Sequence, residues 1–176
     1  MTRVVEAETP DQLEAVRRLM RAFVSWHRER HVEDLELIDT YFDAAGFETE
    51  LASLPGKYAP PRGRLLLATV GERPAGCVAL RELSDSACEM KRMFVDPGLR
   101  GRGVGRALGE SVVRAARAAG YRRMLLDTSF RQTEAQELYR RLGFCPVEPY
   151  YELPKRLREW LVFMALDLEE PPLPPV

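Results

Sequence analysis

Residues 95–106 read Val95-Asp96-Pro97-Gly98-Leu99-Arg100-Gly101-Arg102-Gly103-Val104-Gly105-Arg106 and form a glycine- and arginine-rich stretch. It joins an apolar segment typical of a strand, residues 87–95, to a segment with helical periodicity, residues 103–119. Glycines let the backbone approach an anion closely, and a helix N-terminus adds N–H groups and partial positive charge. Three arginines in the stretch add full charges. The stretch therefore predicts a site for an anionic ligand, with a pyrophosphate as the expected group.

Two other phosphate loops do not fit this stretch. The dinucleotide pattern G-x-G-x-x-G fails because Arg106 or Leu108 stands at its last position, depending on where the pattern begins. The pattern G-x-x-x-x-G-K-[ST] of nucleotide-binding loops fails because no lysine follows any of these glycines. A dinucleotide-dependent oxidoreductase is therefore disfavoured. The residues alone leave open a glycine-rich turn that only begins a helix.

The surrounding sequence predicts an α/β domain over residues 1–168, followed by a proline-rich tail, 169–176. Strand patterns occur in seven segments: 2–7, 64–70, 75–83, 87–95, 123–127, 144–151 and 160–168. Helical patterns occur in four segments, of which Gly46 is expected to divide the second: 10–27, 34–54, 103–119 and 132–142. The strand-helix-strand crossover from Val95 to Asp127 implies a parallel pair inside a mixed sheet.

Two sequence blocks resemble a known family. Arg100-x-x-Gly103-x-Gly105, after Val95-Asp96-Pro97, resembles the pyrophosphate motif of the GNAT superfamily of acyl-CoA-dependent N-acyltransferases. Ala135-x-x-Leu138-Tyr139-x-x-Leu142-Gly143-Phe144 is similar to the second block of that superfamily, on the expected helix. The resemblance implies an α/β fold with a GNAT-like mixed, mostly antiparallel sheet of about seven strands. It also implies a central parallel splayed pair and about four flanking helices.

The resemblance further implies that acetyl-CoA binds as a co-substrate. Backbone amides of residues 101–106 would hold its pyrophosphate, and the pantetheine arm would lie along residues 93–95 in the splay. Gln132 stands where the family often has an asparagine that contacts the pantetheine or adenosine side. The expected coenzyme contacts are Met93, Phe94, Val95, Arg100, Gly101, Arg102, Gly103, Val104, Gly105, Arg106, Gln132, Ala135 and Tyr139.

Two residues are expected to be catalytic. Tyr139 matches the family tyrosine that often protonates the departing thiolate, and a core tyrosine is the alternative. Glu89 is the expected general base, because family members frequently carry an acid at this place and partial burial would raise its pKa. The alternative for Glu89 is a cross-strand pair with an arginine such as Arg81. Cys88 as an acyl-accepting nucleophile is a minor option, since the family usually transfers directly.

The acceptor is expected to contact residues 29–54 and the tyrosines Tyr150 and Tyr151. Residues 29–54 hold eight acids and one arginine, whereas residues 91–123 hold nine bases and two acids. This segregation suggests a cationic or amphipathic amine, and a solvated acidic helix face is the alternative. The predicted reaction moves an acetyl group from acetyl-CoA to a primary amine of a small molecule, directly through a tetrahedral intermediate. The alternative function is a non-catalytic acyl-CoA-binding regulatory module.

Composition limits the remaining classes. The net charge of −1, from 26 basic and 27 acidic residues, argues against nucleic acid and anionic membranes as partners, and no apolar run predicts a membrane span. Three cysteines without C-x-x-C spacing and no signal-peptide pattern predict reduced thiols in a cytoplasmic protein. No metal site is predicted, and His27 and His31 are expected to be solvated. The identity of the acceptor, a small molecule or a protein terminus, and formation of a homodimer stay open.

Overall fold

Seven strands form one sheet in the computed structural model, which describes residues 1–169. Their order across the sheet is β1-β2-β3-β4-β5-β7-β6, and every neighbouring pair is antiparallel except β4 and β5. The strands are β1 (Thr2–Glu6), β2 (Arg64–Val70), β3 (Arg73–Glu82), β4 (Ala87–Val95), β5 (Arg123–Ser129), β6 (Cys145–Val147) and β7 (Leu161–Asp167). The predicted mixed sheet with one parallel pair is confirmed. The predicted tail, apart from Glu169, lies outside the described residues.

Six α-helices flank the sheet within residues 1–169, rather than about four. They are α1 (Pro10–Arg30), α2 (Leu35–Phe42), α3 (Ala44–Ala52), α4 (Val104–Ala118), α5 (Thr133–Arg141) and α6 (Lys155–Trp160). The predicted helix 34–54 is divided at Asp43, which has a φ of 40°, and Gly46 lies inside α3. The sequence patterns missed α6 because a helix of 6 residues is too short to show a periodic apolar face.

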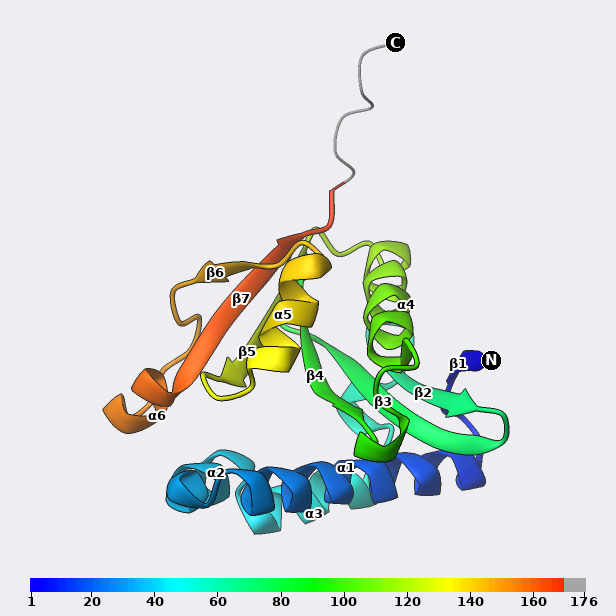
Figure 1. Cartoon of the computed structure of the whole chain (residues 1–176). Coiled ribbons are helices and arrows are strands. Elements are labelled where there is room, and N and C mark those ends of the chain that lie inside the picture. Colours follow the sequence, from blue (N-terminus) through cyan, green and yellow to red (C-terminus); the bar gives the residue numbers. More distant parts are fainter. Residues whose placement is uncertain (170–176) are drawn as a thin grey trace.

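The helices cover the two faces of the sheet as separate layers. Figure 1 shows α1, α2 and α3 on one side, and α4 and α5 on the other. One apolar core lies between the sheet and α4, with Leu108 and Val112 at its centre. A second core lies between the sheet and the N-terminal helices, with Val16 and Ile38 fully buried. Helix α1 begins with a capping box in which Thr9 and Gln12 satisfy each other's backbone N–H groups.

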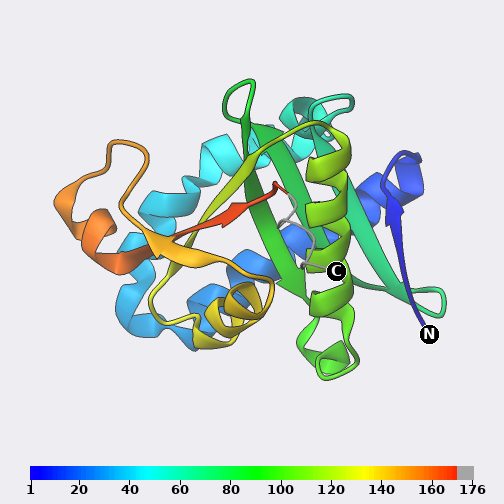
Figure 2. The same ribbon diagram turned by 90° about the horizontal axis from the view of Figure 1, so that it is seen from above.

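The parallel strands β4 and β5 are paired only at their N-terminal ends. Their register partners are Ala87 with Arg123, Cys88 with Met124, and Glu89 with Leu125. Beyond this point the strands diverge, as Figure 2 shows. Strand β4 also bends at Arg92, which has a φ of 57°, opposite a register shift in β3. The result is a split in the centre of the sheet, as the expected splay requires.

Candidate active site

The glycine-rich stretch forms the connection from β4 to α4. Gly101 and Gly103 have φ values of 75° and 76°, which favour glycine, and a Cβ added at either would meet no atom within 4 Å. These two glycines thus leave open space beside the backbone of the loop, here called the cradle. Side chains at positions 101 and 103 would fill this space. The first N–H groups of α4 have no acceptor within the helix, so they can bind an anion here.

A cavity, here called the loop cavity, extends from this cradle. Its lining comes from the loop, the end of β4, the start of α5 and helix α1. The residues that line it are Phe23, Trp26, Arg30, His31, Met93, Phe94, Val95, Arg100, Gly101, Gly103, Val104, Gly105, Arg106, Arg131, Gln132, Thr133, Glu134, Ala135, Leu138 and Arg141. The structure thus brings together most of the predicted coenzyme contacts. Arg102 is exposed and lies outside the loop cavity.

The loop cavity is strongly basic. The sequence reasoning missed Arg30, Arg131 and Arg141, which join Arg100 and Arg106 in the lining, against the single acid Glu134 among the described residues. They come from α1, the β5–α5 turn and α5, so no local motif could have grouped them with the loop. The guanidinium of Arg100 lies 4.4 Å from the centre of the Trp26 ring, which holds it over the cavity. Five arginines against one acid in the lining fit a ligand with several phosphate groups, which would take the place of the carboxylates that these arginines pair with.

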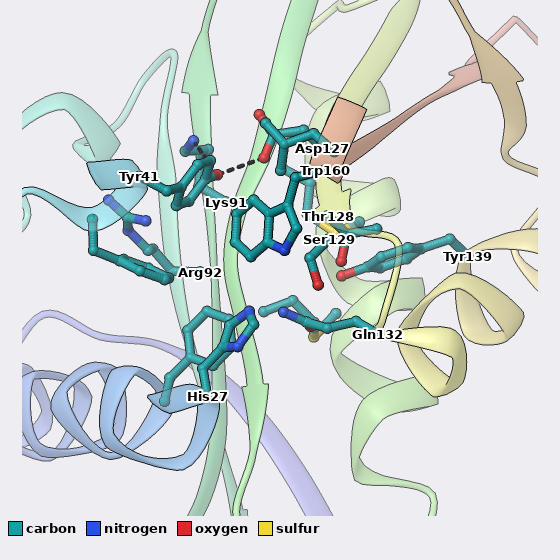
Figure 3. Close-up of a pocket in the computed structure, with 15 residues that line it drawn as sticks. His27, Tyr41, Lys91, Arg92, Asp127, Thr128, Ser129, Gln132, Tyr139 and Trp160 are labelled. Carbon is teal, nitrogen blue, oxygen red and sulfur yellow. Dashed lines mark hydrogen bonds between the residues drawn. The ribbon is translucent and has the colours of Figure 1, made fainter. Parts of the chain in front are cut away.

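A second cavity, the split cavity, occupies the opening between β4 and β5 (Figure 3). The residues that line it are Phe23, His27, Tyr41, Phe42, Met90, Lys91, Arg92, Met93, Asp127, Thr128, Ser129, Gln132, Tyr139, Trp160 and Leu161. Three of them, Phe23, Met93 and Gln132, also line the loop cavity. The two cavities are therefore neighbours, and an extended ligand in one can reach the other.

Tyr139 lies at the split cavity, where Figure 3 shows its hydroxyl pointing toward Thr128 and Ser129. Its ring is buried against Phe144, as the alternative of a core tyrosine requires, and its hydroxyl still lies at the cavity. Burial and then the charge of Asp127 raise the pKa of Tyr139, so its hydroxyl keeps a proton to donate at neutral pH. The buried Ser129 Oγ has no hydrogen-bond partner within residues 1–169.

Glu89 does not line either cavity. Its side chain is 1% exposed, and its carboxylate accepts hydrogen bonds from Arg81 Nε at 2.7 Å and from the hydroxyl of Tyr150. Burial alone would raise its pKa, but Lys91, Tyr150 and Arg81 outweigh burial and lower it. The expectation of a raised pKa is therefore wrong, and the cross-strand pair of Arg81 and Glu89 is confirmed.

Asp127, which the sequence reasoning did not single out, supplies the carboxylate of the split cavity. It accepts hydrogen bonds from Tyr41 Oη at 2.5 Å and Tyr151 Oη at 2.7 Å. Lys91 Nζ donates to the same Tyr41 oxygen at 3.2 Å, so Lys91, Tyr41 and Asp127 form a chain across the split (Figure 3). An acid directly after the apolar run 124–126 was the sequence signal for this residue.

The two histidines are buried, so the expectation that they are solvated is wrong. His27 is 1% exposed and packs among aromatic rings that include Trp160 and Phe42, and His31 lies 5.0 Å from it, ring to ring. Burial lowers the pKa of His27 to about 4, so this imidazole is neutral at physiological pH. His27 Nδ1 and His31 Nε2 have no hydrogen-bond partner in the described part of the chain.

The acids of residues 29–54 do not line the split cavity or the loop cavity in the structure of residues 1–169. Most of them pair with basic residues of other elements instead. The pairs are Glu33 with Arg131, Asp34 with Arg131, Glu36 with Arg156, Asp39 with Arg28, Glu48 with Arg21, and Glu50 with Arg92 and Lys57. The acidic segment therefore stabilises the packing of the helices, and the reason for expecting a cationic acceptor is removed.

The cysteines do not take part in either cavity among the residues described. Cys77, Cys88 and Cys145 are free, and the first two are buried. Burial raises the pKa of the Cys88 thiol to about 12, so it is not a thiolate at neutral pH, which argues against a nucleophilic role. Within residues 1–169 no group of three His, Cys, Asp or Glu side chains is arranged to hold a metal ion. No helix in that range is both long and apolar enough to cross a membrane.

Comparison with known proteins identifies the family. The family described as "Acetyltransferase (GNAT) family" matches residues 35–144. An uncharacterized N-acetyltransferase of Schizosaccharomyces pombe is 38% identical over 125 residues, which cover 70% of this chain and 75% of that protein. The N-acetylaspartate synthetase of Danio rerio is 32% identical over 117 residues, 65% of this chain but only 41% of that protein. The chain therefore belongs to the GNAT family of acetyltransferases, as predicted.

Solved structures show the same fold. An acetyltransferase from Streptococcus agalactiae 2603 matches with a TM-score of 0.70 at 21% identity, covering 94% of this chain and 98% of that one. The PaiA N-acetyltransferase of Thermoplasma acidophilum, in complex with coenzyme A, matches with a TM-score of 0.69 at 13% identity, covering 95% and 99%. The class of enzyme expected from the sequence, an acyl-CoA-dependent N-acyltransferase, is thus confirmed at the level of the family.

Proposed function

We propose that residues 1–168 form one catalytic domain that moves an acetyl group from acetyl-CoA to the primary amine of a small molecule. One observation carries the proposal: the cavity that begins at the glycine-rich loop adjoins the split between β4 and β5, where the Tyr139 hydroxyl lies. The relative named N-acetylaspartate synthetase has a small-molecule product, which supports a small acceptor. The three free cysteines support a reducing, cytoplasmic location.

The loop cavity would hold the coenzyme part of acetyl-CoA. The pyrophosphate would bind to the backbone amides of residues 101–106, and the arginines of the cavity would pair with its phosphates. The pantetheine arm would lie along residues 93–95, beside Gln132 and Ala135. From Met90 onward β4 has no register partner on β5, so its free backbone groups are available to the thioester. Such N–H groups can stabilise the negative oxygen of a tetrahedral intermediate.

Acetyl transfer is then direct. The neutral amine nitrogen attacks the thioester carbon, the C–N bond forms and the C–S bond breaks. Tyr139 donates a proton to the departing sulfur, and a carboxylate accepts a proton from the nitrogen. We propose Asp127 as that carboxylate because it lines the split cavity. Glu89, the base expected from the sequence, is the alternative and would act through Tyr150 or Lys91.

The decisive experiment measures free CoA and acetylated amine by mass spectrometry. The whole chain is incubated with acetyl-CoA, with and without a panel of primary amines. Release of CoA that depends on an amine and matches the acetylated product supports the proposal. Tight binding of acetyl-CoA with no turnover for any amine would instead favour a regulatory acyl-CoA-binding module.

A further inference from the structure

The arrangement of charges in the split cavity points to an acceptor that carries a carboxylate as well as its amine. We infer that Lys91 binds this carboxylate, while Asp127 faces the amine. The inference rests on the proposed acetyl transfer and adds the chemical class of the acceptor. It concerns Lys91, to which neither the family motifs nor proton transfer to Asp127 assigns a role.

Lys91 and Asp127 face each other across the split from two different strands. Side chains alternate along a strand, and Met90 and Leu126 belong to the core against α4. Their neighbours Lys91 and Asp127 therefore point to the opposite face, where α2 supplies Tyr41. Lys91 Nζ lies 3.2 Å from the Tyr41 oxygen, and Asp127 Oδ1 lies 2.5 Å from the same oxygen. The distance between the two charged groups is therefore no greater than the combined length of these two hydrogen bonds. A small amino acid spans such a distance with its own ammonium and carboxylate groups.

Lys91 has hydrogen-bonding capacity to spare. An ammonium group has three N–H donors, and one of them is used, toward Tyr41 Oη at 3.2 Å, in the described structure. The nearest carboxylate, that of Glu89, lies 3.9 Å away, and the Glu89 Oε1 atom concerned already accepts a hydrogen bond from Arg81 at 2.7 Å. The side chain of Lys91 is only 15% exposed, so water satisfies it poorly. A ligand carboxylate would supply the missing acceptor.

The other cation of the split cavity is already occupied. Arg92 donates from Nε to Glu50 Oε2 at 2.8 Å and from Nη2 to Glu50 Oε1 at 3.4 Å. Its guanidinium also lies 5.3 Å from the centre of the Phe42 ring. Because the edge of its guanidinium is paired with Glu50 and its face is stacked on Phe42, Arg92 has few free N–H donors for a ligand. Lys91 is therefore the group that discriminates between acceptors with and without a carboxylate.

A purely cationic acceptor fits this site poorly. The ammonium of Lys91 would repel a second cation in a partly buried cavity, where charges are weakly screened. An amine with a nearby carboxylate pairs with both Asp127 and Lys91 and leaves neither charge unpaired. The cavity is then charge-balanced with the acceptor in place.

The test compares acceptors in matched pairs. Each pair consists of an amino acid and its decarboxylated amine: phenylalanine with phenethylamine, leucine with isopentylamine, and lysine with cadaverine. Product formation from acetyl-CoA gives kcat and KM for each. For the unmodified chain we expect kcat/KM to be about ten- to a hundredfold higher for the better amino acids than for their amines, the size of a hydrogen bond to a charged group.

Variants assign this preference to one side chain. Lys91→Met should raise KM for the amino acids by the same factor and lower KM for the amines, because the repelling ammonium is gone, and Lys91→Arg should restore part of the preference. Lys155→Met is the matched control, because Lys155 is 86% exposed on α6, away from both cavities. This variant should change kcat/KM for neither the amino acids nor the amines.

Three outcomes would overturn the inference, and they differ in what else they affect. Equal or better turnover of the amine in every pair removes the carboxylate preference but leaves acetyl transfer standing. An equal loss for amino acids and amines in Lys91→Met makes Lys91 a structural residue. No CoA release with any amine, despite acetyl-CoA binding, refutes the proposed function and the inference with it.

Discussion

The loop cavity and the split cavity are built from different kinds of groups. The loop cavity uses backbone groups, an unusual glycine conformation and an excess of arginine. The split cavity uses side chains that are already paired with one another, such as Lys91, Tyr41 and Asp127. Ligand binding by backbone groups should be sensitive to a change of backbone conformation and tolerant of the loss of a side chain. Binding by paired side chains should be sensitive to the loss of one of those side chains. The following variants test this contrast.

The largest effect is expected from Gly103→Val. A φ of 76° is strained for any side chain with a Cβ, so the loop must move and the cradle is lost. Affinity for acetyl-CoA should fall at least about a hundredfold, the cost of several lost charge-assisted hydrogen bonds, as measured by isothermal titration calorimetry. Gly71→Val is the control, since Gly71 has a φ of 61° but lies in the β2–β3 turn. Equal affinity in the two variants would refute the cradle.

Asp127→Asn should have the next largest effect. Without its carboxylate the amine loses its proton acceptor, and kcat should fall about a hundredfold while affinity for acetyl-CoA stays the same. Steady-state kinetics of Glu89→Gln provides the comparison, with an expected loss of less than about tenfold because Glu89 lies outside the cavity. Asp85→Asn, in an exposed turn, is the control. The reverse order of losses would assign the base to Glu89.

Tyr139→Phe should lower kcat by about tenfold, less than general acids usually contribute, because a thiolate is a good leaving group even without a proton donor. Acetyl-CoA affinity, measured by calorimetry, should change little. Tyr121→Phe makes a matched control: Tyr121 is also buried, but its hydroxyl donates to the Arg62 carbonyl oxygen at 2.8 Å, outside both cavities. An unchanged kcat in Tyr139→Phe would remove its proposed role.

Lowering the pH should destabilise the fold through His27, which lines the split cavity. Its pKa is about 4 in the fold and 6.5 without it, so between these values the unfolded chain binds more protons. The free energy of unfolding should therefore be highest above pH 6.5 with respect to this group. It should fall as the pH drops toward 4, by at most about 3 kcal/mol. Urea unfolding from pH 7 to 4 measures it. His27→Gln should flatten the profile in this window, and an equally steep profile would contradict the assignment.

The smallest effect is expected from Arg106→Gln in the loop cavity. Arg106 is largely exposed and pairs with Glu110, so water and salt screen its charge. Affinity for acetyl-CoA should fall about threefold, as expected for a screened surface charge, and by less at high salt. Arg102→Gln, outside the cavity, should change it less. A loss as large as that of Gly103→Val would mean that side chains, rather than backbone, dominate this cavity.

The same contrast explains what the sequence could predict. The loop cavity depends on two continuous blocks, so Gly103 and Ala135 were found from local spacing. Its distant arginines, such as Arg30, were missed because only the packing of α1 brings them to the loop. The fold itself followed from apolar periodicity and the 95–127 crossover, except where an element was short.

The split cavity could not be assembled from the sequence in this way. It combines side chains from α1, α2, β4, β5, α5 and α6, and no spacing rule relates Tyr41 to Asp127 or His27 to Trp160. Charge counts were misleading there: the acidic segment satisfies arginines of neighbouring elements, and burial of Glu89 did not raise its pKa because three donors and cations surround it. Such compensation depends on tertiary contacts, which composition does not reveal.

The two tryptophans of the chain give each cavity its own optical reporter. Trp26 lies under Arg100 in the loop cavity, and Trp160 lines the split cavity with its Nε1 donating to Asp34 at 3.0 Å. Indole emission responds to nearby charge, so a coenzyme phosphate that draws Arg100 away from Trp26 will alter its fluorescence. With Trp26→Phe, the remaining signal comes from Trp160 alone. Occupancy of the two cavities can thus be followed separately in real time, without labelling the protein.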